Sequence, residues 1–594
     1  MARSTTAPRI RRHGGALRRD AATRHLCAGA YLDPAFRRTV LRQVYNDTAH
    51  MVAPSYGFDL VPVVRHAWRA WLIDTAQHLC VLVILLLNPP AGIVVVSALC
   101  LWYLLRVMAR SARTVLPLRA KQAMDRLLHR TRWLSDSDEL RRHVRLLRLS
   151  GLGCAVLPLT LPIAAGFERV PLERMARSAA FSALLVIVVV GVGAAIRQIS
   201  LNRMHHDSAG SLRPQKLSLR QSTIDDQQSH PYIVYRRPSP PEPDENEDET
   251  KRFRFDPFDD GRPSPFAGSG KTVHRWLPPL TVQLLKRQPL GIGDELGRHT
   301  PMEVLEYPNP PFEAHQLVAH LKKAMAPMGD LEDPTGLRGF TVHDRLFIAE
   351  PDVEAGPEWL RIRPGQKEID ERIDDPYDAV HHFLEIGATA TGELVTTAFV
   401  RVTVKGRALS LDFATCALTR TPADYQLLNA FAEATDGAVL RSALRSLLGL
   451  PAEVLRAWRL AEAPRFLIGA MRARKNRMLK PRRGMAIAAR LSIREEQATP
   501  WEHAQLDEVT IHDHMKLIEQ RLLKATEDFL ESYEIDTSAF KKRATSIINT
   551  GVFNMGGKTE IKQSAVGTKA QVRADSRESD RGTGQPPANE GDQR

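Results

Sequence analysis

The sequence predicts an α-helical membrane domain followed by a cytoplasmic α+β domain, and three observations lead to this fold class. Long uncharged stretches interrupt the first third of the 594 residues. Basic residues gather beside those stretches. Residues 394–404 alternate between apolar and polar side chains, as a half-buried β-strand does. The average composition, with 43% hydrophobic and 25% charged residues, is that of an ordinary soluble protein and hides this division.

Two regions carry the predicted transmembrane helices. Between Trp71 and Leu105 there is no Lys or Arg, and Asn88-Pro89-Pro90 divides the stretch into two apolar halves. A second region holds the apolar runs 149–167 and 178–196. Because about 20 apolar residues cross a bilayer, we expect two helical hairpins at 71–107 and 149–197, and thus four transmembrane helices. One long kinked helix over 71–107 is the alternative.

The position of the basic residues predicts the orientation in the membrane. Residues 1–70 contain 12 Arg and 4 acidic residues, and residues 106–148 contain 12 Lys or Arg and 4 acidic residues. Both segments should face the cytoplasm under the positive-inside rule, which two hairpins permit. We therefore expect an inner (plasma) membrane protein with cytoplasmic termini, a basic N-terminal segment (1–70) and a basic helical loop (108–148). The net charge of +14 then indicates contact with anionic lipid headgroups, and no nucleic-acid partner is expected.

The remaining chain is divided by composition. Residues 198–262 are rich in Pro and acidic side chains and predict a disordered linker. Residues 263–435 predict an α+β domain, in which 381–386, 394–404 and 409–418 form an antiparallel β-meander and 313–325 a helix. Residues 573–594 predict a disordered tail.

Residues 436–485 predict basic amphipathic helices. Their apolar residues recur at helical spacing and alternate with many arginines. Such helices lie in a membrane interface, although a core-facing helix with a solvated basic face fits equally well. The expected membrane-interface contacts are Arg441, Arg445, Arg456, Trp458 and Arg459.

Residues 486–572 predict a helical segment and a Gly-rich β-structured end. The helical segment has apolar residues at alternating spacings of four and three, which is typical of a coiled coil. Fewer than three heptads are present, so a packed amphipathic helix and a homo-oligomeric coiled coil both remain possible. The residues at these positions are Ile511, Met515, Ile518, Leu522, Ala525 and Phe529.

The sequence contains few motifs that are typical of catalytic or ligand-binding sites. The segment Ser264–Thr272 ends in Gly-Ser-Gly-Lys-Thr, so Lys271 and Thr272 are candidate phosphate contacts. A glycine-rich turn before a strand explains the same residues. Asp74 and His78 lie one helical turn apart at the start of the first apolar run and form a candidate transport pair. The five cysteines form no C-x-x-C pair, and we expect no catalytic site, cofactor or metal.

Several segments resemble uncharacterised integral membrane proteins of actinobacteria such as Streptomyces. The resemblance is carried by Asn88-Pro89-Pro90, by the segment Ser264–Gly270 leading to Trp276, by Cys416 and by Asn549–Gly557. It implies no known activity. We therefore expect a membrane-anchored protein that binds or scaffolds an unknown protein partner through its cytoplasmic domain. A transport component using Asp74 and His78 is the alternative, and a nucleotide-dependent enzyme is a weaker one.

Overall fold

The computed structural model describes residues 21–127, 137–156, 172–206, 212–236, 265–287, 306–333, 335–353, 362–430, 436–475 and 487–549. The chain divides into two compact units, Met1–Thr537 and Ser538–Arg594. In the second unit the structure describes the helix α20 (Ser538–Asn549). All that follows concerns the first unit.

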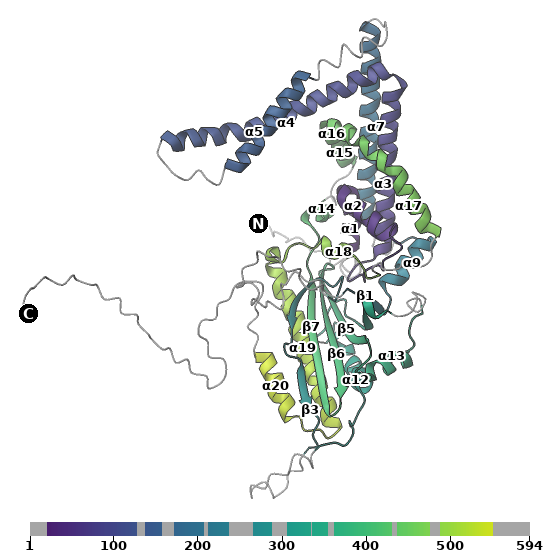
Figure 1. Ribbon diagram of the computed structural model, residues 1–594, viewed down its shortest axis with the longest axis vertical. Coiled ribbons are helices and arrows are strands. Elements are labelled where there is room, and N and C mark those ends of the chain that lie inside the picture. The colour runs from purple at the N-terminus through teal and green to yellow at the C-terminus, as the bar shows by residue number, and fades with distance from the viewer. Residues whose placement is uncertain are drawn as a thin grey trace, which may run out of the picture. The chain divides into compact units, whose positions relative to one another are not determined.

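Three long helices carry the apolar segments (Figure 1). They are α3 (Leu60–Leu87), α4 (Pro89–Leu127) and α7 (Leu172–His206). Each contains a segment long and apolar enough to cross a membrane: Leu60–Leu87, Pro89–Pro117 and Glu173–Met204. The break between α3 and α4 falls at Asn88, whose side chain accepts a hydrogen bond from the Ala91 N–H at 3.4 Å.

The predicted fourth apolar stretch, 149–167, is only partly described. Its first residues end the helix α5 (Ser137–Val156), which packs on α4. Residues 157–171 lie outside the described part of the chain. Three apolar helices are therefore present in the described residues, where the sequence predicts four.

The predicted disordered linker, 198–262, contains ordered elements. The helix α7 continues to His206, and α9 (Leu219–Gln228) and strand β1 (Tyr232–Tyr235) follow. A capping box between Ser218 and Gln221 starts α9, and the buried Arg220 donates hydrogen bonds to the carbonyl groups of Val44 and Tyr45 at 2.7 and 3.0 Å. These contacts with a distant segment stabilise a sequence too polar to fold alone. Residues 237–264 lie outside the described part.

The α+β domain is built on a mixed seven-stranded sheet of order β1-β4-β5-β6-β7-β2, with β3 also paired to β7. Strand β1 runs parallel to β4, and the other pairs are antiparallel. The remaining strands are β2 (Lys271–Arg275), β3 (Leu280–Gln283), β4 (Thr341–Ala349), β5 (Val380–Ala390), β6 (Leu394–Lys405) and β7 (Ala408–Leu418).

Helices and aromatic side chains cover the sheet. Helix α12 (Ala314–Met325) contacts both α13 (Gln366–Asp374) and α19 (Leu506–Ser532), and all three pack against β6. On the other face, Phe266 stacks on Phe399 with ring centroids 4.2 Å apart. The first residues after the undescribed segment 237–264 thus belong to the core of the domain.

The heptad-like face of α19 is buried within the chain. Ile511, Met515, Ile518 and Leu522 are at most 1% exposed, and α19 packs against α12, β5 and β6. Intramolecular packing therefore accounts for the 4-3 spacing, since a pattern that fits a partner helix also fits a sheet covered by a second helix.

A core shared by many elements connects the apolar helices with the sheet. It contains residues of α1 (Ala21–Leu32), α2 (Pro34–Thr39), the π-helical segment η1 (Val40–Tyr45), the first half of α3, the last turns of α7, and α17 (Ala463–Lys475). At the sheet, the Ala22 N–H donates a hydrogen bond to the Gly392 carbonyl at 3.3 Å. The N-terminal segment is thus a packed part of the domain boundary.

The basic segment 436–475 packs along the apolar helices. Helix α15 (Asp436–Leu448) contacts α7, α16 (Leu450–Leu455) contacts α4, and the 3-10 helix η8 (Arg456–Glu462) contacts α3. Leu450 and Val454 lie in one cluster with Val81, Val95 and Val186 of the three long helices. Figure 1 shows α15 and α16 beside α7.

Candidate functional site

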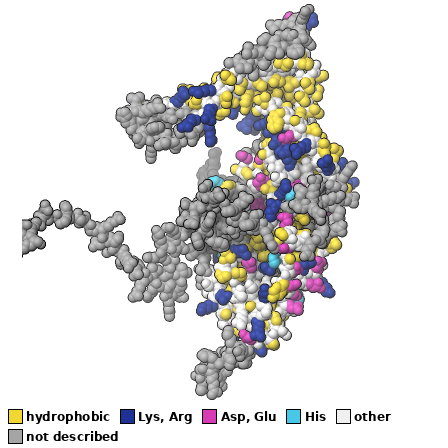
Figure 2. All heavy atoms as spheres, in the orientation of Figure 1, with side chains coloured by type: hydrophobic (Ala, Val, Ile, Leu, Met, Phe, Trp, Pro, Cys, Tyr) yellow, Lys and Arg dark blue, Asp and Glu magenta, His cyan; other side chains and the backbone are white. Residues whose placement is uncertain are grey.

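A hydrophobic surface surrounds the outer halves of the long helices. In α3 the residues up to Ala70 are mostly buried, whereas Leu72, Leu79, Leu86 and Leu87 are more than half exposed. Figure 2 shows hydrophobic side chains gathered over this region, with Lys and Arg side chains directly next to them. An apolar surface of this extent favours a membrane environment.

Asp74 lies where the buried and the exposed parts of α3 meet. Its carboxylate forms ion pairs with Arg37 of α2 and with Arg197 of α7, the latter at 2.8 Å. Arg197 also donates to the Gln77 side chain at 3.2 Å. The Asp74 charge is therefore matched by two guanidinium groups from different elements, which ties α2, α3 and α7 together.

His78 does not contact Asp74 in this arrangement. Its Nε2 lies 3.8 Å from a carboxylate oxygen of Glu453 on α16, and the other oxygen of Glu453 accepts from Arg456 at 2.6 Å. The two predicted members of the transport pair thus belong to two neighbouring ion-pair groups. Their partners, which are Arg37, Arg197 and Glu453, were not identified from the sequence. The only sequence signal for these residues is their position beside apolar runs.

An open pocket adjoins Asp74 between α2, η1, α3, η8 and α17. Its cavity volume is about 70 Å³. Burial lowers the pKa of Arg459 in its wall, and the nearby charges of Arg38, Arg456 and Arg37 lower it further. The charged and polar lining residues are Arg37, Arg38, Arg42, Asp74, Thr75, His78, Arg459 and Glu462.

The five predicted membrane-interface residues lie on α15 and η8. Arg441, Arg445 and Arg456 are exposed, Arg459 is half-buried in the pocket wall, and the Trp458 side chain is 63% exposed. Because these helices contact the apolar helices, Arg459 and Trp458 lie close to the hydrophobic surface. Exposed Trp beside basic residues is typical of a membrane–water interface.

The Gly-Ser-Gly segment has a structural role in the domain. The Gly268 N–H donates to the Glu495 carboxylate at 2.9 Å, and Ser269 is fully buried. Lys271 is exposed at the first position of β2, and Thr272 faces Cys416 on β7. A phosphate loop requires free amides before a helix, whereas here one amide holds an internal carboxylate and a strand follows.

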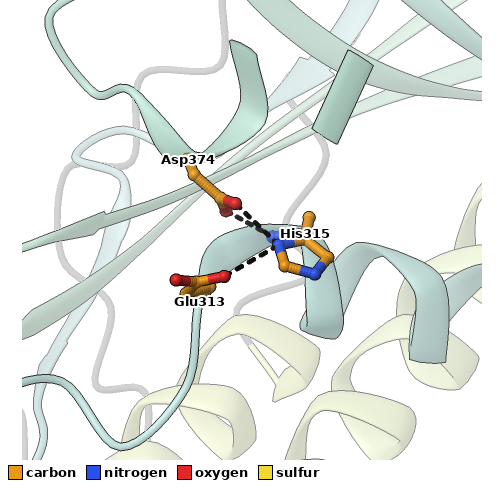
Figure 3. Close-up of side chains that lie close together, drawn as sticks. All are labelled: Glu313, His315 and Asp374. Carbon is orange, nitrogen blue, oxygen red and sulfur yellow. Dashed lines mark hydrogen bonds and ion pairs between the residues drawn. The ribbon is translucent and has the colours of Figure 1, made fainter. Parts of the chain in front are cut away.

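Glu313, His315 and Asp374 are the one group of three potential metal ligands within the described residues (Figure 3). Nδ1 of His315 faces both carboxylates, at 2.6 Å from Asp374 and 3.4 Å from Glu313. Asp374 also accepts from the His315 N–H at 2.9 Å, which caps the first turn of α12. A hydrogen bond from Nδ1–H of His315 to the Asp374 carboxylate accounts for the short distance between them.

Two buried polar groups hold the domain together. Glu385 of β5 accepts from Arg345 at 2.7 Å and from the Tyr56 hydroxyl at 3.0 Å. Glu519 of α19 accepts from Trp276 and Lys516, each at 2.8 Å. Both carboxylates are buried and join segments distant in the sequence, which stabilises the fold.

A comparison with known protein families finds a match for part of the chain. Residues 279–562 match the AbeC-like domain. No curated protein and no solved structure matches the chain. The matched region includes strands β3 to β7, α19 and the basic segment 436–475, whereas the three apolar helices precede it. Residues 279–562 are therefore similar to the AbeC-like domain, and the N-terminal region of apolar helices lies outside the match.

Proposed function

We propose that this chain is a scaffolding protein of the inner (plasma) membrane, whose AbeC-like domain binds a protein partner on the cytoplasmic side. The shared core of α1, α3, α7 and α17 carries this proposal. Tyr425 and Ile493, which follow the sheet in the sequence, lie in the same core as Leu60 and Met204 of the apolar helices. The domain is therefore held against the helices at a fixed position, as a platform for assembly requires.

The same core supports four membrane crossings. The first turn of α3 and the last turns of α7 lie in it, so both lie on one side of the membrane. The chain between them then crosses an even number of times. Helices α3, α4 and α7 would supply three crossings, and a fourth within residues 118–171 completes the two predicted hairpins with both termini in the cytoplasm.

Topology reporters test the membrane part of the proposal. Reporters inserted at Asn88 and at position 170 should be outside, and reporters in the β6–β7 turn at Gly406 and at the C-terminus should be inside. An outside reporter at Gly406 would contradict the cytoplasmic placement of the domain.

Site-specific photo-crosslinking tests the partner-binding part. The first turn of α19 exposes Leu506 (81%) and Val509 (56%), apolar residues that a partner can cover. A photo-reactive residue at 506 should form an adduct with one protein in native membranes, and Val509→Asp should abolish it. The matched control is a photo-reactive residue at Lys405, which is exposed at the end of β6. The same adducts at both positions would indicate non-specific contact.

Transport through Asp74 and His78 is the second candidate, because both lie within a helix apolar enough to cross a membrane. The double ion pair of Asp74 favours a fixed structural role over a carrier that exchanges protons. If the chain is a transporter, Asp74→Asn should abolish transport. The same variant should remove the adduct at position 506 only if the scaffold role also depends on Asp74. The nucleotide-dependent enzyme has the least support, since Lys271 starts a strand.

A further inference from the structure

The pocket beside Asp74 contains more positive than negative charge. Four arginines and two carboxylates line it, which leaves two cations in excess. Clustering guanidinium groups is unfavourable unless an anion joins them, because each charge raises the free energy of its neighbours. The residues concerned are Arg37, Arg38, Arg42, Arg459, Asp74 and Glu462.

The two carboxylates are committed to other arginines. Asp74 pairs with Arg37 and with Arg197, and Glu462 pairs with Arg42 at 2.9 Å. Within the described residues no carboxylate lies at ion-pair distance from the remaining two arginines of the pocket. The excess positive charge therefore belongs to Arg38 of α2 and Arg459 of η8.

Arg459 has an unsatisfied hydrogen-bond donor. Its Nε is buried and has no hydrogen-bond partner in the described part of the chain. A buried donor without an acceptor is unfavourable in a folded protein. An anion in the pocket would compensate the charges of Arg38 and Arg459 together.

The pocket lies at the border of the hydrophobic surface. Thr75 and His78 of α3 line it. They lie in the part of α3 that begins at Leu72, where the residues on the outer side of the helix are exposed. Trp458, next to Arg459, is 63% exposed, and Leu467 and Ile468 of α17 are also exposed. Figure 2 shows the basic side chains directly next to the band of hydrophobic ones. Lipid phosphates occupy this level of a bilayer, between the hydrocarbon and the water.

We propose that Arg38 and Arg459 bind a phosphate group in this pocket, and that the headgroup of an anionic phospholipid supplies it. Arginine suits this ligand, because its planar fork donates two parallel hydrogen bonds to phosphate oxygens. The exposed Trp458 and Leu467 would then contact the acyl chains of the same lipid. The inference rests on the membrane placement given under the proposed function, and it names the lipid class that the platform recognises.

Lipid binding by the purified full chain in detergent tests the proposal. Thermal stability and native mass spectrometry compare phosphatidylglycerol with phosphatidylcholine, and inorganic phosphate serves as the soluble probe. Phosphatidylglycerol should stabilise the wild type more than phosphatidylcholine does. The double variant Arg38→Gln/Arg459→Gln should bind phosphatidylglycerol at least about tenfold more weakly, because each lost hydrogen bond to a charged group changes the equilibrium by about that factor.

The matched control removes two exposed arginines of α17 that do not line the pocket, Arg472→Gln/Arg474→Gln. It carries the same change of net charge and should retain phosphatidylglycerol. An equal loss in both double variants, or no preference for phosphatidylglycerol in the wild type, would overturn the proposal. Stabilisation by inorganic phosphate without any lipid preference would overturn the headgroup as its source.

A second variant guards against loss of folding. Arg38→Lys/Arg459→Lys keeps both charges but not the paired donors, so its affinity for phosphatidylglycerol should lie between those of the wild type and the Gln variant. An affinity equal to that of the Gln variant would contradict recognition by charge. Carbonate extraction of membranes is measured in parallel: release of the wild type would refute the membrane placement, whereas loss of lipid preference alone would leave it standing.

Discussion

Replacing Glu519 by Gln should destabilise the α+β domain, because this fully buried carboxylate is surrounded by three donors. Its Oε1 accepts from Nε1 of Trp276 at 2.8 Å and faces Nε2 of His274 at 3.1 Å. Its Oε2 accepts from Nζ of Lys516 at 2.8 Å. Glutamine can keep the carbonyl oxygen toward Trp276, but it then turns an NH₂ group toward the Lys516 ammonium.

The magnitude follows from that one altered contact. A hydrogen bond to a charged group contributes about 1.5–3 kcal/mol, and breaking a buried ion pair costs about 3–5 kcal/mol. Lys516 is 21% exposed and can turn partly to solvent, so the lower part of this range applies. We expect Glu519→Gln to lower the free energy of unfolding by about 2–3 kcal/mol. Glu519→Ala should cost more, since Trp276 and His274 then also lose their acceptor.

Thermal unfolding of the full chain in detergent measures the effect, with Asp513→Asn on the exposed side of α19 as the control. In a cooperative unit of roughly 250 residues, 2–3 kcal/mol corresponds to a decrease of about 5–10 °C in Tm. Adding Lys516→Met to Glu519→Gln should recover part of the loss, because the donor without an acceptor is removed. If Glu519→Gln lowers Tm no more than Asp513→Asn does, the carboxylate is not the centre of this group.

The pH dependence gives an independent measurement of the same group. Burial by itself raises the pKa of Glu519, but hydrogen bonds from His274, Lys516 and Trp276 outweigh it and lower the pKa below the ordinary value. The unfolded chain therefore binds the proton first as the pH falls. The stabilisation is complete above the unfolded pKa of about 4.3 and is lost as the pH falls through the lower folded pKa. Wild type and Glu519→Gln should converge in stability at that acidic end.

Three further predictions concern the sheet and the apolar helices. Burial lowers the pKa of His382 despite its hydrogen bond to Asp344, so the stability of the fold should decrease as the pH falls below about 6.5. His382→Gln should flatten the dependence of stability on pH between pH 7 and 5. An unchanged slope would show that His382 is not the cause of this dependence. Gly270 has φ +93°, and an added Cβ would lie 2.1 Å from a backbone oxygen of β7. Gly270→Ala should therefore lower the free energy of unfolding by more than about 2 kcal/mol, whereas Gly406→Ala at an open turn should lower it by about 1 kcal/mol. Equal losses in Tm would contradict the steric argument. Asp74→Asn should destabilise the helices by about 3 kcal/mol because two arginines lose their counter-charge, and a Tm equal to that of Thr75→Val would contradict that role.

Long periodic segments were the predictable part of the fold. The apolar stretches correspond to α3, α4 and α7, because a run of apolar residues that long has few stable alternatives to a membrane or core helix. The strand-like stretches 394–404 and 409–418 coincide with β6 and β7, where alternation extends over ten or more residues. In these segments local pattern and tertiary packing require the same structure.

The ordered part of the predicted linker shows where local composition misleads. Residues 219–228 are polar, and their helix depends on Arg220 reaching the carbonyl groups of Val44 and Tyr45 and on the burial of Ile224. Strand β1 likewise exists through its pairing with β4, more than 100 residues away. Composition within a window contains no information on such partners, so the disorder prediction fails there.

The candidate site was predictable only in part for the same reason. Asp74 stands out as the sole acid in an uncharged stretch, and Arg459 belongs to a basic amphipathic segment. Their common pocket is formed by η8 packing on α3, a contact between segments almost 400 residues apart. Arg38 had no distinguishing feature among the many arginines of the first 70 residues.

Those N-terminal arginines also limit what a count of charges says about topology. Arg24 and Arg37 are buried, and Arg37 is neutralised by Asp74, so neither attracts lipid headgroups at a surface. The charge effective for orientation is accordingly smaller than the count of 12 Arg against 4 acidic residues suggests. The proposed even number of crossings rests instead on the common core at the ends of α3 and α7, which involves no charge. Since the proposal has α7 cross the membrane and end on the cytoplasmic side, a cytoplasmic reporter at position 170 would contradict it.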